Sequence, residues 1–88
     1  MYIKYSAHFI RVSKKRFKRK PQLRTKVKKQ LDKLLIDPNY PSLKIHKLKG
    51  ERKDQFSIWI EGNLRVTFYI KSDYYLLIDL VNHDEYQH

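Results

Sequence analysis

The sequence predicts an α+β domain in which a helical hairpin packs on one face of a small antiparallel sheet, in the order β-α-α-β-β-β. Two observations lead to this class. In the first half of the chain, apolar residues recur at the helical period of about 3.6 residues, with cationic residues between them. In the second half, apolar and polar residues alternate in short segments separated by turn signals. The 88 residues fit one domain, expected to span residues 1–88.

The first predicted element is a short strand at residues 2–6, whose side chains alternate between two faces. Ser6 then provides a helix N-cap, because its hydroxyl can accept a hydrogen bond from a backbone N–H of the first turn. A helix follows from about Ala7 to Lys20. Its loose apolar stripe consists of Phe9, Ile10, Val12 and Phe17.

The second helix has a clearer pattern. Pro21 ends the first helix and suits the first position of the next, where a missing N–H costs nothing. Asp37-Pro38-Asn39 ends the second helix. Two amphipathic helices joined by a tight break form an antiparallel hairpin, whose apolar side needs a sheet to cover it. The apolar positions are Leu23, Val27, Leu31, Leu34 and Leu35.

After Pro41 the period changes to two. Residues 43–48 alternate, and three longer segments follow at residues 56–60, 64–70 and 76–83, the first two joined by a hairpin turn at Glu61-Gly62-Asn63. The expected core-facing residues are Phe56, Ile58, Ile60, Val66, Phe68, Ile70, Leu76, Ile78 and Leu80. The face left free by the helices then carries His46, Trp59, Arg65, Tyr69 and His83.

The positive charge is large and concentrated in the first half. The chain holds 20 Lys and Arg against 9 Asp and Glu, a formal net charge of +11 at pH 7. Residues 1–36 contain thirteen of these bases and one acid, whereas residues 37–88 contain seven bases and eight acids. This asymmetry predicts a nucleic-acid partner, an acidic protein partner, or both. A membrane-surface role is disfavoured, because the apolar stripes of the helices are needed for the core.

No feature points to a membrane, a secretory route or a cofactor. The absence of cysteine excludes a disulfide framework and thiolate metal ligands, and it fits a reducing cytoplasm, where we expect the protein. Lys4, His8 and Arg11 interrupt any apolar N-terminal run, so no signal peptide is predicted. No stretch is long enough to span a bilayer, and the His and acidic residues match no metal motif.

The free face of the sheet supplies the parts for cutting RNA without a metal. In that reaction a 2′-OH attacks the adjacent phosphate, which requires a base, an acid at the leaving 5′-oxygen and cations at the phosphate. Imidazole can fill either proton-transfer role, arginine can hold two phosphate oxygens, and aromatic rings stack on unpaired bases. The predicted catalytic residues are His46, Arg65, His83 and Tyr86, and the predicted RNA-binding residues are Lys47, Lys49, Arg52, Lys53 and Trp59.

Each of these residues also has a purely structural interpretation. A histidine on a strand is usually only a polar surface residue. Arg65 follows a turn and could simply pair with Asp79 or Glu61. Trp59 could be a half-buried core residue, and the basic side chains could form a solvated rim.

Three segments of the second half form a recognisable set: LKIHKLKG at residues 43–50, FSIWIEGNLRVTFYI at 56–70 and LLIDLVNHDEY at 76–86. Together with the order of elements, they resemble the RelE/ParE superfamily of bacterial type II toxin–antitoxin toxins over nearly the whole chain. The strongest parts are Leu48-Lys49-Gly50, Asn63-Leu64-Arg65 and Asn82-His83-Asp84-Glu85-Tyr86. Within the superfamily, the chain is most similar to the RelE-like mRNA interferases of the histidine-containing YoeB, YafQ and HigB-like branch.

The resemblance implies an endonuclease that cuts mRNA in the ribosomal A site without a metal and leaves a 2′,3′-cyclic phosphate. Arg65 would bind the scissile phosphate, His83 would act as general acid, and His46 would be the other proton-transfer group. Tyr86 would hold or stack the substrate, and the basic residues would contact mRNA or rRNA phosphates. The cluster lacks the glutamate base that some members use.

The resemblance also implies a cognate antitoxin, with an acidic and partly disordered segment that complements the basic half of this chain. The toxin–antitoxin complex would bind operator DNA through the antitoxin. Two alternatives stay open: a ParE-like DNA gyrase inhibitor on the same fold, and a non-catalytic RNA- or DNA-binding module. The imidazole and arginine set favours the nuclease, because a gyrase inhibitor does not need it.

Overall fold

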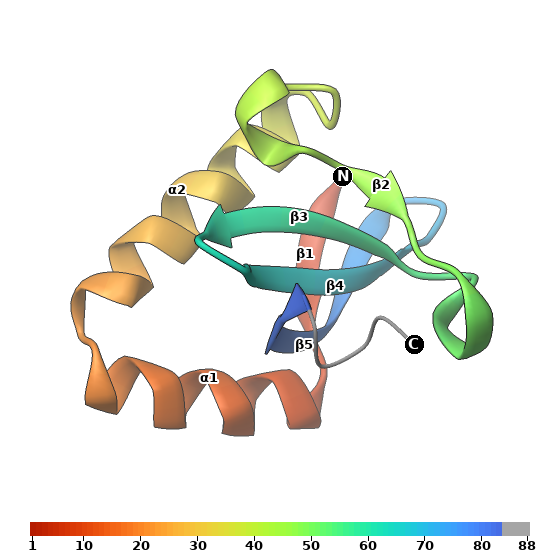
Figure 1. Cartoon of the computed structure of the whole chain (residues 1–88). Helices are drawn as coiled ribbons and strands as arrows, with labels where there is room; N and C mark the ends of the chain where they lie inside the picture. The colour runs from red at the N-terminus through yellow and green to blue at the C-terminus, as the bar shows by residue number, and fades with distance from the viewer. Residues whose placement is uncertain (84–88) are drawn as a thin grey trace.

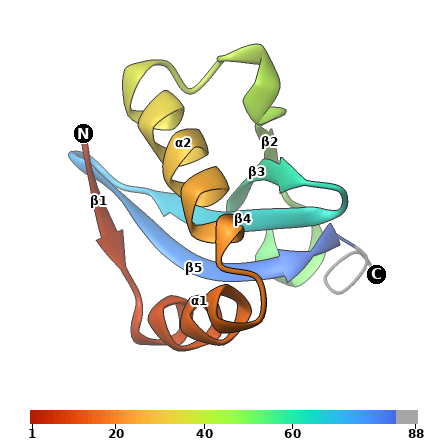
Figure 2. The ribbon, with the colours of Figure 1, turned by 90° about the vertical axis from the view of Figure 1, so that its left-hand side faces the viewer.

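The computed structural model describes residues 1–83. Two helices lie on one side of a five-stranded sheet with the strand order β1-β5-β4-β3-β2 (Figures 1 and 2). The helices are α1 (Ala7–Arg19) and α2 (Gln22–Ile36), and the strands are β1 (Tyr2–Tyr5), β2 (His46–Lys47), β3 (Phe56–Glu61), β4 (Leu64–Ile70) and β5 (Tyr74–Asn82). Short 3-10 turns, η1 (Pro41–Leu43) and η2 (Gly50–Arg52), flank β2. No helix within residues 1–83 has the length and apolar content needed to cross a membrane.

The predicted α+β class, with a helical hairpin on one face of a small sheet, is confirmed. Two details of the sheet differ from the prediction. The order is β-α-α-β-β-β-β, one strand longer, because His46 and Lys47 pair with β3. The sheet is mixed rather than wholly antiparallel, because β1 pairs in parallel with β5. That pairing joins the two ends of the chain, and no local pattern could have specified it.

Helix α1 begins where Ser6 leaves the sheet, as predicted. The Ser6 hydroxyl accepts a hydrogen bond from the Phe9 N–H at 3.0 Å, which satisfies one of the free donors of the first turn. The same hydroxyl donates to the carbonyl of Ile78, and the Arg16 Nε donates to the carbonyl of Leu80. Because β1 pairs with β5 only as far as Leu77, these two side chains, from the cap and the body of α1, satisfy carbonyls on the β5 edge beyond that point.

The core lies between the helices and the sheet. It contains Leu23, Val27, Leu31 and Leu34 of the predicted α2 stripe and the alternating residues of β3 and β4, with Leu34, Ile58, Val66 and Phe68 fully buried. The prediction was wrong for Leu35 of the α2 stripe and for Ile10 of the α1 stripe, which are exposed. Leu43 of η1 closes it at one end.

The predicted core face of β5 was partly wrong. Leu80 is buried as expected, but Tyr75 and Leu77 are the core residues in place of Leu76 and Ile78. A register shift explains this: Thr67 pairs with Asp79 and Phe68 with Leu77, so Ile78 has no partner in β4. Such a bulge reverses which side chains face the core. Ile70, the last residue of β4, is also exposed rather than buried.

Candidate active site and nucleic-acid interface

The face of the sheet opposite the helices, here called the open face, carries a row of polar side chains. His46 of β2 pairs with Ser57 of β3. Ser57 pairs on its other side with Thr67 of β4, which pairs with Asp79 of β5. Paired residues point to the same face, so these four side chains cross the sheet in line. Ser57, Thr67 and Asp79 are buried, whereas His46 is exposed above them.

Two of the predicted catalytic residues meet on this face. The rings of His46 and His83 have centroids 6.2 Å apart and lie edge to face. They come from opposite ends of the second half of the chain. The backbone leaves the sheet after Asn82, where the N–H of His83 donates to the carbonyl of Asn63. The geometry therefore brings together two imidazoles that are 37 positions apart in the sequence.

His46 is held by hydrogen bonds at both ring nitrogens. Nδ1 lies 3.3 Å from the carbonyl oxygen of Lys44, and Nε2 lies 3.4 Å from the hydroxyl oxygen of Ser57. Ser57 is fully buried, so its hydroxyl provides a fixed partner beneath an exposed ring. The sequence indicated neither Lys44 nor Ser57 as a site residue.

Arg65 lies on the open face directly opposite Trp59, its partner in β3. Its Nε is buried and has no hydrogen-bond partner within residues 1–83. A buried guanidinium nitrogen without an acceptor is unusual in a folded protein. Arg65 is therefore a cation of the open face whose Nε has no acceptor within the described residues.

The two acids that could have paired with Arg65 are engaged by other cations. Glu61 accepts hydrogen bonds from Lys20 at 2.7 Å and Lys26 at 2.6 Å, and these bonds hold the pKa of Glu61 below its ordinary value. Asp79 is bound elsewhere, as described next. The structural interpretation of Arg65 as a simple partner of Glu61 or Asp79 is therefore wrong.

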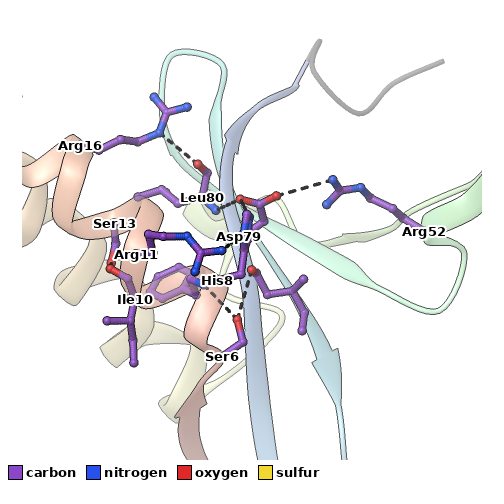
Figure 3. A network of polar contacts seen from close by, with 11 residues as sticks. Ser6, His8, Ile10, Arg11, Ser13, Arg16, Arg52, Asp79 and Leu80 are labelled. Atoms are coloured by element: carbon purple, nitrogen blue, oxygen red, sulfur yellow. Dashed lines mark hydrogen bonds and ion pairs between the residues drawn. The ribbon is translucent and has the colours of Figure 1, made fainter.

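Asp79 connects three separate segments of the chain (Figure 3). Its carboxylate accepts from His8 Nε2 of α1 at 3.1 Å and from the N–H of Leu80 at 2.9 Å, and Arg52 Nη2 of the η2 turn lies 3.6 Å away. Arg52 is thus directed across the open face toward β5, while Lys47, Lys49 and Lys53 are exposed. His8, which showed no functional signal in the sequence, anchors this network.

The aromatic side chains of the open face already make polar and cation–π contacts within the protein. The Trp59 indole N–H donates to the carbonyl of Gly62 at 2.9 Å, and the ammonium of Lys44 lies 5.0 Å from the ring centroid. The hydroxyl of Tyr69 lies 3.5 Å from the Gln55 amide nitrogen. Trp59 is half-buried, as the structural interpretation expected, and is still on the predicted face. The fourth predicted catalytic residue, Tyr86, lies outside the described residues.

Thr67→Val should leave the protein as stable as the wild type or make it more stable. The Thr67 side chain is fully buried, and its hydroxyl has no hydrogen-bond partner within residues 1–83. Removing such a hydroxyl without changing the shape relieves a desolvation cost of about 1–3 kcal/mol. Thermal denaturation followed by circular dichroism tests this, with Thr67→Ser, which keeps the hydroxyl but loses a methyl, as the matched control. A lower melting temperature for the valine variant would show that the hydroxyl is satisfied in the native state.

Comparisons with known proteins agree on the fold. No protein-family model and no curated protein matches the sequence. Among solved structures, the YoeB/ParE toxin from Agrobacterium tumefaciens matches with a TM-score of 0.78 at 15% identity, covering 94% of this chain and 99% of that one. The E. coli DinJ–YafQ complex matches at 0.74 and 23% identity, covering 96% and 94%. The YoeB–YefM toxin–antitoxin complex from Staphylococcus aureus matches at 0.77 and 16%, covering 92% and 94%.

These neighbours belong to one structural group, the RelE/ParE superfamily of toxin–antitoxin toxins. The matches extend over almost the full length of both chains in each case, and the sequence identities are low. The chain of 88 residues therefore has the fold of the RelE/ParE superfamily toxins.

Proposed function

We propose that this protein is the toxin of a bacterial type II toxin–antitoxin system and a metal-independent endoribonuclease that cleaves mRNA in the ribosomal A site. One observation carries the proposal: the His46 and His83 rings lie 6.2 Å apart on an open sheet face that also holds Arg65. Two imidazoles beside a cation are what phosphodiester cleavage by an internal nucleophile requires. A surface that only binds has no need of a second imidazole.

The reaction uses the 2′-OH of the substrate as the nucleophile. One imidazole accepts the proton of that hydroxyl as its oxygen bonds to phosphorus. The bond from phosphorus to the 5′-oxygen then breaks, and the other imidazole donates a proton to the departing oxygen. The products are a 2′,3′-cyclic phosphate and a 5′-hydroxyl. Each proton transfer needs a nitrogen within about 3 Å of the oxygen concerned, and adjacent rings can reach the same phosphodiester.

Arg65 stabilises the charge that builds on the non-bridging oxygens. Its guanidinium offers paired N–H donors that match two phosphate oxygens, and a partly buried site strengthens the interaction. Tyr86 holds or stacks the substrate, and Trp59 offers an aromatic surface for a base. The exposed side chains of Lys47, Lys49 and Lys53 contact phosphates around the cut, and Arg52 contributes a cation across the open face.

The basic helices supply the docking surface for ribosomal RNA. Residues 1–36 carry thirteen bases and one acid, so binding should weaken steeply as salt rises. A cognate antitoxin with an acidic segment complements the same charge, and two of the structural neighbours are complexes of YafQ with DinJ and of YoeB with YefM. The complex binds operator DNA through the antitoxin, and the protein acts in the cytoplasm.

Inhibition of DNA gyrase is the second candidate function. It is favoured by the A. tumefaciens neighbour, whose name joins YoeB and ParE, and by the fact that one fold can serve both activities. The pair of imidazoles on the open face argues for the nuclease, since blocking an enzyme by binding requires no proton transfer.

Primer extension on a defined mRNA distinguishes these functions. Purified protein is incubated with the mRNA alone and with programmed ribosomes that hold a known codon in the A site. We expect cuts within the A-site codon only when ribosomes are present. Growth arrest on expression without cuts under either condition would refute the nuclease, and a gyrase supercoiling assay would then test the second candidate. Neither growth arrest nor any cut would leave a non-catalytic binding module.

A further inference from the structure

A basic groove lies between α1 and the part of β5 that β1 leaves unpaired. It consists of two adjoining hollows, of about 430 and 280 Å³, which share Arg16 and Arg19 among their lining residues. The first hollow lies beside His8 and Asp79, and the second reaches the turn after β3, at Asn63. The Lys and Arg residues that line this α1–β5 groove come from α1 and the residue after it: Lys15, Arg16, Arg19 and Lys20.

The α1–β5 groove has an excess of positive charge. Its four Lys and Arg residues face two acids, Glu61 and Asp79, and both acids are already held by basic side chains, as described above. Lys15 and Arg19 are exposed, and within residues 1–83 neither forms an ion pair with an acid. The groove therefore attracts an anionic chain, and these two side chains can contact it directly.

The β5 edge beside the groove is closed to the addition of a strand. The carbonyl of Ile78 accepts a hydrogen bond from the Ser6 hydroxyl, and the carbonyl of Leu80 accepts one from Arg16 Nε (Figure 3). The N–H of Leu80 donates to the carboxylate of Asp79. An extended peptide binds a sheet edge mainly through such backbone groups, which here have partners already. A nucleic-acid strand needs none of them, because it is held through its phosphates.

The groove is continuous with the candidate site. Asn63 and Asn82 line its second hollow. The carbonyl of Asn63 accepts the hydrogen bond of the His83 N–H at 2.6 Å, so the end of the groove adjoins His83. An RNA strand with one phosphate on the open face beside His83 can therefore continue past the end of β5 into the groove.

We infer that the α1–β5 groove binds the single-stranded mRNA next to the cut, through contacts of Lys15 and Arg19 with its phosphates. The inference rests on the proposed function, because it takes the strand at His83 to be the substrate. Lys15 and Arg19 are four positions apart, so they are neighbours on one side of the helix and can contact one strand together. A row of cations along a groove follows a phosphate backbone without reading its sequence.

Two matched double variants test the groove by binding. Lys15→Ala/Arg19→Ala removes two charges from the groove, and Lys14→Ala/Lys18→Ala removes two exposed charges of α1 that do not line it. Alanine favours the helix at all four positions, so both variants should fold, which equal melting temperatures would confirm. The probe is a labelled single-stranded RNA of about 12 nucleotides with 2′-O-methyl groups, which block cleavage. Fluorescence anisotropy with the full chain then gives its affinity at several salt concentrations.

The groove variant should bind this RNA about 10-fold more weakly than the wild type at about 0.1 M salt. The slope of log affinity against log salt should shrink by about 1.4, because two phosphate contacts to a single strand are lost. The control variant should keep the wild-type slope and stay within a few fold in affinity. Equal losses in the two variants would overturn the inference, since they would mean that net charge alone attracts the RNA.

Labelled poly-glutamate of the same length distinguishes RNA from an acidic protein partner. The groove variant should lose more affinity for the RNA than for poly-glutamate, because the closed β5 edge gives a peptide no backbone contact to add to its charge. A loss of affinity seen with poly-glutamate and not with RNA would overturn the inference and assign the groove to an acidic protein.

A cleavage experiment tests whether the bound strand is the mRNA. Uncharged methylphosphonate linkages are placed, one at a time, near the scissile phosphate of an A-site mRNA on programmed ribosomes. At one position or more, the neutral linkage should slow single-turnover cleavage by the wild type about 5-fold, the share of one phosphate contact. The same linkage should have no further effect in the groove variant, where that contact is already gone. Additive effects at every position would overturn the inference, and weaker ribosome binding would then assign the two cations to ribosomal RNA.

The binding and cleavage measurements separate this inference from the proposed function. If the wild type cleaves but the two double variants bind RNA alike, the nuclease stands and the role of the groove is wrong. If only the groove variant loses affinity for RNA, and the wild type does not cleave on ribosomes, the groove does bind a single strand. The nuclease, and with it the identity of that strand as its substrate, is then wrong.

Discussion

Arg65→Ala should reduce the cleavage of ribosome-bound mRNA by about 10²- to 10³-fold, the usual effect of removing one donor that stabilises charge in a transition state. The reason is that Arg65 has no acidic partner within residues 1–83, while both nearby acids are engaged by other cations. Its guanidinium is therefore available for the phosphate. Single-turnover primer extension measures the loss. Because Arg65 makes no ion pair within residues 1–83, the melting temperature should change little.

Two further variants make this result interpretable. Arg65→Lys keeps the charge but not the paired donors, so it should recover only part of the activity. Lys71→Ala removes the same charge from the turn beyond the far end of β4, about 20 Å along the strand, and should leave the rate unchanged. Equal losses for Arg65→Ala and Lys71→Ala would mean that net charge, and not a phosphate contact at Arg65, explains the effect.

His46→Ala and His83→Ala should each lower the single-turnover rate by about 10²- to 10⁴-fold, the range expected for a general acid or base. The two rings lie 6.2 Å apart and would act on the same phosphodiester. Because both rings act in one reaction, the cleavage rate of the double variant should fall by much less than the product of the two fold-reductions seen in the single variants. Ribosome binding, measured by co-sedimentation, should be retained in all three variants.

His8→Gln is the matched control for these imidazoles. His8 binds Asp79 from α1 and does not take part in the His46 and His83 contact. The glutamine amide can still donate to the Asp79 carboxylate, so cleavage should stay within a few fold of the wild type. A wild-type rate in either His46→Ala or His83→Ala would rule out that ring as a proton-transfer group. The role would then fall to another group, such as a lysine of the open face or a ribosomal residue.

Local patterns in the sequence predicted most of the fold correctly. The period of α2, the Ser6 cap and the turn at residues 61–63 each depend on residues close together in the chain, so they could be located without a structure. The open face of β3 and β4 was also predicted, because strict alternation between Phe56 and Phe68 follows from the pleat of a strand.

The site could be predicted in part. Alternation placed His46 and Arg65 on the open face, and both lie there, with His83 beside His46. The functional roles of these residues stay predictions. The sequence indicated neither Lys44 nor Ser57 as a site residue. A pattern of polar and apolar residues shows neither the left-handed backbone of a lysine nor the burial of a serine. A lysine in that conformation becomes visible only when its contacts with His46 and Trp59 are seen.

The sequence by itself determined the helical hairpin, the alternating strands and the basic first half of this protein, since periodicity, caps, turns and charge are properties of neighbouring residues. Only the tertiary structure decided the parallel pairing of β1 with β5, the bulge that turns Leu77 instead of Ile78 into the core, and the partners of Asp79. The β1–β5 pairing and the contacts of Asp79 with His8 and Arg52 join segments that are far apart in the chain, whereas the bulge lies between the consecutive strands β4 and β5. Such contacts are selected by the packing of the whole domain, because their energy appears only when both segments are already in place.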